Sequence, residues 1–268
     1  MTVENVGQDL IQCYRDSPQP SYKVSNYFKI YEELFGHLRG TECTFIEIGV
    51  LNGGSLFMWR KWLGEKARII GVDLNPAAKK WEAAGFEIHI GDQGNPEFWV
   101  EFFGKIGDFD ALLDDGGHQS FQQIVTLEAA LAAARRKCVI VIEDTCASFL
   151  AEFSGHGQHS FLEYAKASSD LLLAKTSTFF PGQFPAIQNS SAVEKLASVQ
   201  SISFYSGMVA YKVDPVAVER PYLLWNKEPD AAAATDFRYA GATSATMEWP
   251  DMFSRKTVTV KGGRLGDA

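Results

Sequence analysis

The sequence has few of the features that mark several large classes of protein. Its four cysteines, Cys13, Cys43, Cys138 and Cys146, are scattered without Cys-x-x-Cys spacing, so neither a disulfide framework nor a zinc site is supported. No run of basic residues occurs and the formal net charge is −8, which argues against an electrostatically bound nucleic-acid partner. No apolar stretch approaches the ~18 residues of a membrane span, and MTVENVGQDLIQ at the start does not resemble a signal peptide. We therefore expect a cytoplasmic protein that binds neither nucleic acid nor membrane.

The composition nevertheless provides enough apolar material for one large core. Of the 268 residues, 46% are hydrophobic and 13% are aromatic. Short apolar runs typical of buried strands alternate along the chain with segments of helical periodicity. This alternation predicts an α/β fold.

Two acidic motifs follow two of the predicted strands. DDGGH (114–118) comes after the apolar run FDALL, and IEDT (142–145) comes after CVIVI. Adjacent parallel strands would bring both motifs to the same edge of a sheet. Each acid taken alone is most simply a solvated loop residue or a helix N-cap. Taken together, four polar residues of these motifs favour a functional site: Asp115, His118, Glu143 and Asp144.

The residue types in these motifs indicate metal chemistry. Asp115, Glu143 and Asp144 would repel one another at one sheet edge unless a cation lay between them, and oxygen ligands suit Mg²⁺ or Mn²⁺. His118 follows Asp115 by three residues and is placed to remove a proton from a group that the metal holds. The alternative is that His118 caps the helix that begins near Ser120.

A glycine-bearing turn precedes these motifs. The segment FIEIGVLNGGSL (45–56) reads as a strand, a turn and the start of a helix. Gly53 and Gly54 would let the backbone approach a ligand closely, and the helix start offers free amide donors. The spacing is not that of the dinucleotide-binding motif, so the turn alone is a weak indication of a nucleotide-type site.

Acidic residues also end the next two predicted strands. Asp73 ends 67–74 and is placed to accept hydrogen bonds from a ribose, while Asp92 ends 86–92 within reach of an adenine amino group. Both also precede turn sequences, in which aspartate often caps backbone amides. The first strand carries an acidic residue and a glycine turn, and acidic residues end the next two strands. This succession along the chain favours the ligand interpretation.

Together these segments resemble a class I S-adenosylmethionine-dependent methyltransferase. EIGVLNGGS (47–55), GVDLNP (71–76) and GDQGN (91–95) are similar to its first three motifs. DDGGH and IEDT resemble the metal-dependent sugar O-methyltransferases of the mycinamicin and macrocin type and the related cephalosporin-hydroxylase-like group. The resemblance covers about residues 22–213.

The resemblance implies a fold, a ligand set and a base. The fold would be Rossmann-like, with a mostly parallel seven-stranded sheet, an antiparallel last strand and helices on both faces. Asp115, Glu143 and Asp144 would bind the metal, and His118 would act as general base. The residues placed at the cofactor are Glu47, Gly49, Gly53, Gly54, Ser55, Asp73, Asp92, Gln93 and Asp114.

Two departures from the family pattern leave the acceptor open. Gly117 stands where serine is usual, and TCASF (145–149) replaces a stretch that contains histidine and tyrosine. Two loops could contact an acceptor: 154–160, which carries His156 and His159, and 178–191, which carries Phe and Pro. Exposed loop histidines usually have no specific role.

We expect three regions along the chain: an N-terminal arm (1–21), the methyltransferase domain (22–213) and an extension (214–268) that packs on this domain or on a second subunit. Formation of a homo-oligomer stays open. Helices are predicted at 26–40, 55–64, 77–85, 95–104, 120–137 and near 161–170, and a β-hairpin at 198–213.

The function that this reading favours is Mg²⁺-dependent methylation of a sugar hydroxyl on a natural product or glycan, with S-adenosylmethionine as donor. A catechol-like acceptor would use the same metal chemistry. A hydroxylase-like relative would need iron or a redox partner, and a non-catalytic binding module would have no need for His118.

Overall fold

The computed structural model describes residues 7–153, 159–174, 196–215, 244–248 and 257–261. The chain divides into two compact units, Met1–Leu162 with Ser198–Val216 and Glu163–Ala197 with Ala217–Ala268. The first unit contains the seven-stranded sheet. From the second, the structure describes most of helix α6 (Phe161–Ala174) and an antiparallel pair formed by β8 (Ser244–Glu248) and β9 (Thr257–Lys261).

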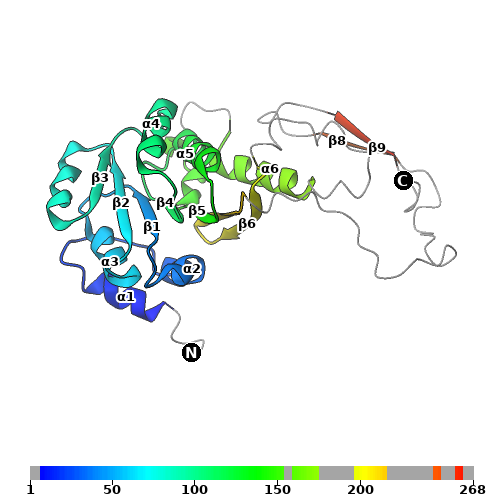
Figure 1. Ribbon diagram of the computed structural model, residues 1–268. Coiled ribbons are helices and arrows are strands. Elements are labelled where there is room, and N and C mark those ends of the chain that lie inside the picture. Colours follow the sequence, from blue (N-terminus) through cyan, green and yellow to red (C-terminus); the bar gives the residue numbers. More distant parts are fainter. Residues whose placement is uncertain (1–6, 154–158, 175–195, 216–243, 249–256, 262–268) are drawn as a thin grey trace. The chain divides into compact units, whose positions relative to one another are not determined.

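The first unit is built on one mixed sheet with the strand order β3-β2-β1-β4-β5-β7-β6 (Figure 1). Strands β1 to β5 are parallel, β7 is antiparallel to β5, and β6 is antiparallel to β7. The expected Rossmann-like topology with its closing hairpin is therefore confirmed. The strands are β1 (Thr44–Ile48), β2 (Arg68–Asp73), β3 (Glu87–Ile90), β4 (Ala111–Asp114), β5 (Cys138–Ile142), β6 (Val199–Tyr205) and β7 (Met208–Val213).

Helices cover both faces of this sheet, as expected. Figure 1 shows α1, α2 and α3 on one side and α4 and α5 on the other. These helices are α1 (Gln8–Arg15), α2 (Tyr27–Phe35), α3 (Gly54–Leu63), α4 (Pro96–Ile106) and α5 (Ser120–Ala133). Within the described ranges, none of the helices is both long and apolar enough to span a membrane.

Short 3₁₀ helices complete the unit: η2 (Gly36–Leu38), η3 (Pro76–Ala84), η4 (Thr145–Phe149) and η5 (Ala151–Phe153). The predicted helix 77–85 is the 3₁₀ helix η3, which Asn75 begins by accepting the Ala77 N–H. The predicted helix 26–40 ends as an α-helix at Phe35 and continues only as η2.

The aromatic residues of α2 belong mainly to the core. Tyr31 and Phe35 are fully buried and contact Trp59 of α3, whose ring centroid lies 4.6 Å from that of Phe45 in β1. Such edge-on and tilted ring contacts stabilise a core by more than the burial of their apolar area alone. This cluster fixes α2 and α3 against β1, and the tyrosines of α2 also reach the carboxyl ends of the strands, as described below.

The predicted N-terminal arm includes helix α1. Its Leu10 is fully buried in the same core, and Asp16 beyond its end pairs with Lys61 of α3 at 2.6 Å. The division of the chain into arm, domain and extension stays a prediction. His156, the loop 178–191 and most of the extension 214–268 lie outside the described residues.

Candidate active site

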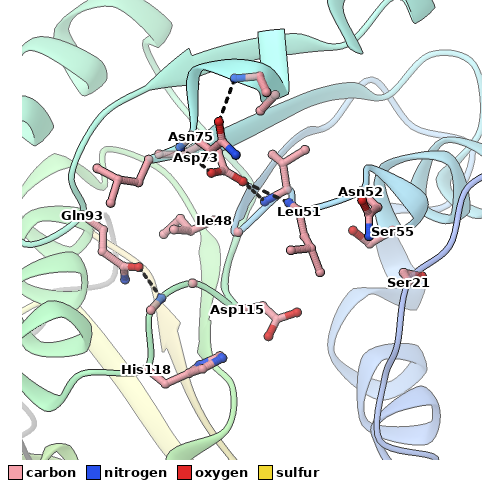
Figure 2. Close-up of a pocket in the computed structure, with 18 of the residues that line it drawn as sticks. Ser21, Ile48, Leu51, Asn52, Ser55, Asp73, Asn75, Gln93, Asp115 and His118 are labelled. Atoms are coloured by element: carbon pink, nitrogen blue, oxygen red, sulfur yellow. Dashed lines mark hydrogen bonds between the residues drawn. The ribbon is translucent and has the colours of Figure 1, made fainter. Parts of the chain in front are cut away.

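A pocket of about 410 Å³ lies at the carboxyl ends of β1, β2 and β4. This is the edge of an open α/β sheet at which ligands usually bind, and the volume is typical of a small-molecule site. Figure 2 shows Asp73 and Asn75 on one side of the pocket and Asp115 and His118 on the other. The wall includes Ser21, Asn52, Ser55, Asp73, Gln93 and Asp115.

Asp73 holds the turn between β1 and α3. Its Oδ2 accepts hydrogen bonds from the backbone N–H groups of Val50 (2.9 Å) and Leu51 (3.0 Å), and its Oδ1 accepts one from Asn75 (2.7 Å). A carboxylate oxygen can accept more than one hydrogen bond, so Asp73 can serve both the turn and a ligand in the pocket. Its predicted contact with a ribose stays a prediction.

The glycines of this turn make room for the protein's own chain. Gly49 has φ of +89°, and a Cβ added there would lie 2.1 Å from the carbonyl oxygen of Asp115. A Cβ on Gly53 would lie 2.5 Å from the Trp81 ring, and one on Gly54 would lie 2.5 Å from the carbonyl oxygen of Gln19. Gly49 lines the pocket, whereas Gly53 and Gly54 are not part of the wall.

Glu47 is buried beneath the pocket. Its carboxylate accepts hydrogen bonds from the Ser55 hydroxyl (2.7 Å) and the Trp59 indole (3.1 Å), so it holds α3 against β1. Burial raises the pKa of Glu47, and the nearby ammonium of Lys23 opposes this rise. Ser55 reaches the pocket wall and Glu47 does not.

The segment that follows β3 positions the DDGGH turn through Gln93. The Gln93 amide donates to both oxygens of Asp114 at 3.0 Å, and its oxygen accepts from the Gly117 N–H at 2.8 Å. Burial raises the pKa of Asp114 to about 6. Asp92 is exposed, accepts from the Gly94 N–H at 2.8 Å and is not part of the wall, so its adenine contact stays a prediction.

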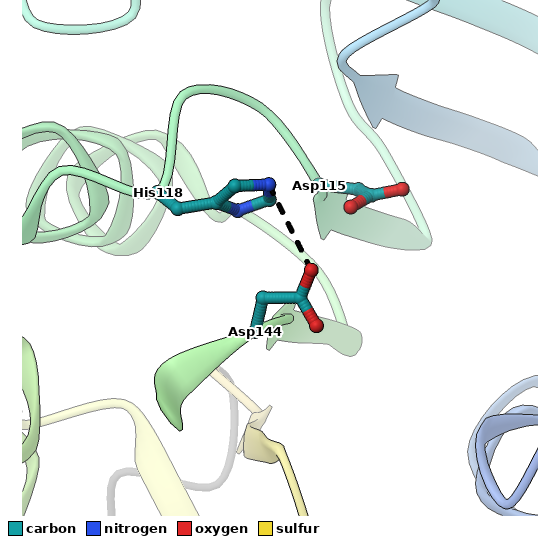
Figure 3. Close-up of side chains that lie close together, drawn as sticks. All are labelled: Asp115, His118 and Asp144. Atoms are coloured by element: carbon teal, nitrogen blue, oxygen red, sulfur yellow. Dashed lines mark ion pairs between the residues drawn. The ribbon is translucent and has the colours of Figure 1, made fainter. Parts of the chain in front are cut away.

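The structure brings together Asp115, His118 and Asp144, which offer ligand atoms that all lie within 4.8 Å of one another (Figure 3). The imidazole Nε2 of His118 lies 3.7 Å from Oδ2 of Asp144. The other oxygen of Asp144 accepts a hydrogen bond from the hydroxyl of Tyr27 at 2.6 Å, which fixes that carboxylate from α2. We call these three residues the Asp–His–Asp cluster.

The backbone is strained around the pocket and the Asp–His–Asp cluster. Among the described residues other than glycine, positive φ values occur at Leu51 (47°), His118 (56°) and Asp144 (50°). All three belong to the pocket wall or to the Asp–His–Asp cluster. Such conformations cost about 1–3 kcal/mol each and persist where the surrounding structure enforces them, often at functional sites.

Glu143, the third predicted metal ligand, has other partners in the structure. Its buried carboxylate accepts a hydrogen bond from the Tyr31 hydroxyl, and both of its oxygens lie 3.4 Å from Nζ of Lys23. Its backbone carbonyl accepts from Gln123 at 3.0 Å. Burial raises the pKa of Glu143 well above its ordinary value. Its role as a ligand stays a prediction.

Lys23, Tyr27 and Tyr31 also contact the carboxylates of the site, although no sequence motif predicts them there. Lys23 lines the pocket with its Nζ 2.5 Å from Asp115 and 3.7 Å from Glu47. Burial alone would lower the pKa of Lys23, but the surrounding carboxylates raise it above its ordinary value. A single lysine between two predicted segments gives no pattern, whereas the tyrosines belong to the predicted helix 26–40, where aromatic residues at helical spacing usually indicate core.

Comparison with known proteins gives partial matches in sequence. No protein-family model matches the chain. It is 27% identical over 139 residues to the 8-demethyl-8-alpha-L-rhamnosyl tetracenomycin-C 2'-O-methyltransferase of Streptomyces olivaceus, which covers 49% of this chain and 36% of that protein. It is 28% identical over 132 residues to the demethylmacrocin O-methyltransferase of Streptomyces fradiae, covering 47% and 33%. The matches therefore span about a third of these relatives.

The fold has a solved counterpart in MycE, the methyltransferase from the mycinamycin biosynthetic pathway, in complex with Mg and S-adenosylhomocysteine. That structure superposes with a TM-score of 0.65 at 21% identity, over 80% of this chain and 58% of MycE. The likeness shows a shared fold. With the sequence matches, it makes this chain a distant and partial relative of the macrocin and mycinamicin sugar O-methyltransferases, which belong to the class I S-adenosylmethionine-dependent methyltransferases.

Proposed function

We propose that the chain is an S-adenosylmethionine-dependent O-methyltransferase that methylates a sugar hydroxyl of a natural product or glycan with the help of Mg²⁺ or Mn²⁺. The observation that carries this proposal is that Asp115 and His118 belong both to the pocket wall and to the Asp–His–Asp cluster. A donor in the pocket and an acceptor at the cluster would therefore lie next to each other. Holding two reactants in this way is a large part of catalysis of a transfer reaction.

The pocket suits a nucleoside with an amino-acid tail. Asp73 at the end of β2 and Asn75 just beyond it lie on one side of the pocket, in the position where a ribose is bound in folds of this class. Ser55 at the start of α3 and Gln93 after β3 add polar groups to a wall that mixes polar and apolar residues. Among the proposed cofactor residues, Gly49, Ser55, Asp73 and Gln93 would contact the ligand, and Glu47, Gly53, Gly54 and Asp114 would support them from behind.

The donor atoms of the Asp–His–Asp cluster fit a divalent cation. Asp115 and Asp144 offer carboxylate oxygens, the ligands that Mg²⁺ and Mn²⁺ prefer. The buried Nδ1 atom of His118 has no hydrogen-bond partner among the described residues, which leaves this nitrogen for a ligand or an acceptor. When bound by Asp115 and Asp144, with Glu143 as a further candidate, the metal would supply a Lewis acid that lowers the pKa of the acceptor hydroxyl.

His118 would take up the acceptor's proton. When bound, S-adenosylmethionine would supply the methyl group, with S-adenosylhomocysteine as the leaving group, and the proton of the acceptor hydroxyl would pass to the imidazole. Asp144, 3.7 Å from Nε2, would stabilise the imidazolium that forms. The Tyr27 hydroxyl holds Asp144 in this place.

A sugar is proposed as acceptor because the Streptomyces olivaceus relative named above is, by its name, a 2'-O-methyltransferase of a rhamnosyl tetracenomycin. MycE has also been solved with Mg, S-adenosylhomocysteine and mycinamycin VI. The test begins with calorimetric titration of the protein with S-adenosylhomocysteine. Turnover is then measured on rhamnosylated aromatic polyketides and on catechols, with EDTA and after Mg²⁺ is restored.

We expect binding of S-adenosylhomocysteine, metal-dependent turnover of a glycoside, and loss of turnover in Asp115→Asn. The matched control is Asp108→Asn, which removes the same charge from an exposed residue before β4. Turnover of catechol alone would replace the sugar with an aromatic diol. Absence of S-adenosylhomocysteine binding would refute the proposed function.

A further inference from the structure

The ammonium of Lys23 lies among three carboxylates of the candidate active site. Its Nζ is 2.5 Å from Oδ2 of Asp115, 3.4 Å from both oxygens of Glu143 and 3.7 Å from Oε1 of Glu47. The side chain is 2% exposed, so these ion pairs are shielded from solvent. Three carboxylates from β1 and from the ends of β4 and β5 thus share one cation, and that cation comes from the segment before α2.

Asp115 belongs to two groups at once. One of its oxygens binds Lys23, and the residue is also a member of the Asp–His–Asp cluster. Glu143, which the sequence motif places among the metal ligands, is paired with the same ammonium. A divalent ion and Lys23 would therefore draw on the same carboxylates, and two cations held this close repel each other strongly in a buried site.

The segment that carries Lys23 is attached to the pocket at several points. The Tyr14 hydroxyl donates to the carbonyl of Ser21 at 2.7 Å, and the Ser17 hydroxyl donates to the carbonyl of Gly54 at 2.8 Å. Ser21, Tyr22 and Lys23 all line the pocket. The place of the ammonium is thus linked to one wall of the proposed cofactor site.

We propose that Lys23 is a tethered cation that occupies the Asp115–Glu143 side of the metal site, and that a divalent ion binds fully only when the ammonium leaves these carboxylates. This inference rests on the proposed function for the presence of the metal. It assigns Lys23 a role that a purely structural ion pair would not have. Metal binding would expose Lys23 and alter the pocket wall formed by 21–23.

The first test compares the affinity for Mn²⁺ of the wild type, Lys23→Met and Lys80→Met by calorimetry. Lys80 is the matched control because it lines the same pocket and lies over the Trp81 ring, 4.6 Å from its centroid. Both substitutions remove one positive charge from the pocket. We expect Lys23→Met to bind Mn²⁺ on the order of tenfold more tightly, since it removes a repelling cation, and Lys80→Met to stay within about twofold of wild type.

The second test uses wild-type protein alone, in case Lys23→Met does not fold with three uncompensated carboxylates. Amines are acetylated with an N-hydroxysuccinimide ester, and the modified lysines are identified by mass spectrometry. Without metal, Lys23 should be protected while the exposed Lys66 reacts. With saturating Mn²⁺, we expect Lys23 to become modified and Lys66 to be unchanged.

The outcomes separate this inference from the proposed function. If Mn²⁺ binds the wild type and Lys23→Met equally, or if Lys23 stays protected at saturating Mn²⁺, Lys23 is a permanent structural counter-ion and the inference is wrong, while the metal site stands. If Mn²⁺ binds neither protein, both the inference and the metal in the proposed function are lost, whereas S-adenosylhomocysteine binding would still stand by itself.

Discussion

Replacement of Gly49 by alanine tests the close approach between the first strand and the DDGGH turn. Gly49 follows β1, donates its N–H to Val72 at 2.8 Å and has φ of +89°. A Cβ there would lie 2.1 Å from the carbonyl oxygen of Asp115 and 2.8 Å from its carbonyl carbon. Both neighbours are backbone atoms, so no side-chain rotation relieves the contact.

Two terms set the expected loss of stability. Left-handed backbone costs an alanine about 1–2 kcal/mol relative to glycine. The contact with Asp115 adds about 1–3 kcal/mol of overpacking, because the Asp115 N–H is bound to the carbonyl of Ile48 at 3.0 Å and resists displacement. We therefore expect Gly49→Ala to lower the free energy of unfolding by roughly 2–5 kcal/mol.

Urea unfolding followed by tryptophan fluorescence measures this effect, with Gly104→Ala as the control. Gly104 lies in α4, and a Cβ there meets nothing within 4 Å, so alanine should stabilise the protein by up to ~1 kcal/mol. A transition midpoint of Gly49→Ala equal to that of the wild type would refute the reasoning, since it would mean that β1 and the DDGGH turn separate at little cost.

Three further predictions concern the site and the cysteines. His118→Ala should reduce turnover by ~10²–10⁴-fold with little change in S-adenosylhomocysteine affinity, and near-full activity of His118→Asn would remove the general base. Asp73→Ala should weaken S-adenosylhomocysteine binding by about 1–3 kcal/mol in calorimetry, and unchanged affinity would exclude the ribose contact. Burial raises the pKa of the Cys138 thiol to about 12 from 9.0, so the unfolded thiol ionises first and this residue makes stability fall as pH rises from 9.0 toward 12. At pH 8, iodoacetamide should therefore modify the exposed Cys146 and leave Cys138 unmodified until the protein is unfolded, and equal labelling would contradict this.

The sequence by itself determined the seven strands of the large sheet and most of the helices between them, but not helix α1. Buried parallel strands are nearly continuous apolar runs, so CVIVI predicts β5 (Cys138–Ile142) from local composition alone. The turn Ser206-Gly207 between two alternating runs predicts the hairpin of β6 and β7. The sequence also placed Asp115, His118 and Asp144 at one edge of the sheet, because the side chains that end parallel strands meet there.

Only the tertiary structure decided what each of these residues touches. Lys23 and Asp115 are 92 positions apart in the sequence, and their contact depends on how α1, α2 and α3 pack on β1. The same packing brings the Tyr31 hydroxyl to Glu143 and fills the space beside Gly53 with Trp81. Local sequence patterns record backbone preference and burial, but a long polar side chain reaches its partner through the sum of all packed contacts. The motifs DDGGH and IEDT therefore predicted the carboxylates of the site, and only the fold revealed the Lys23 ammonium between them.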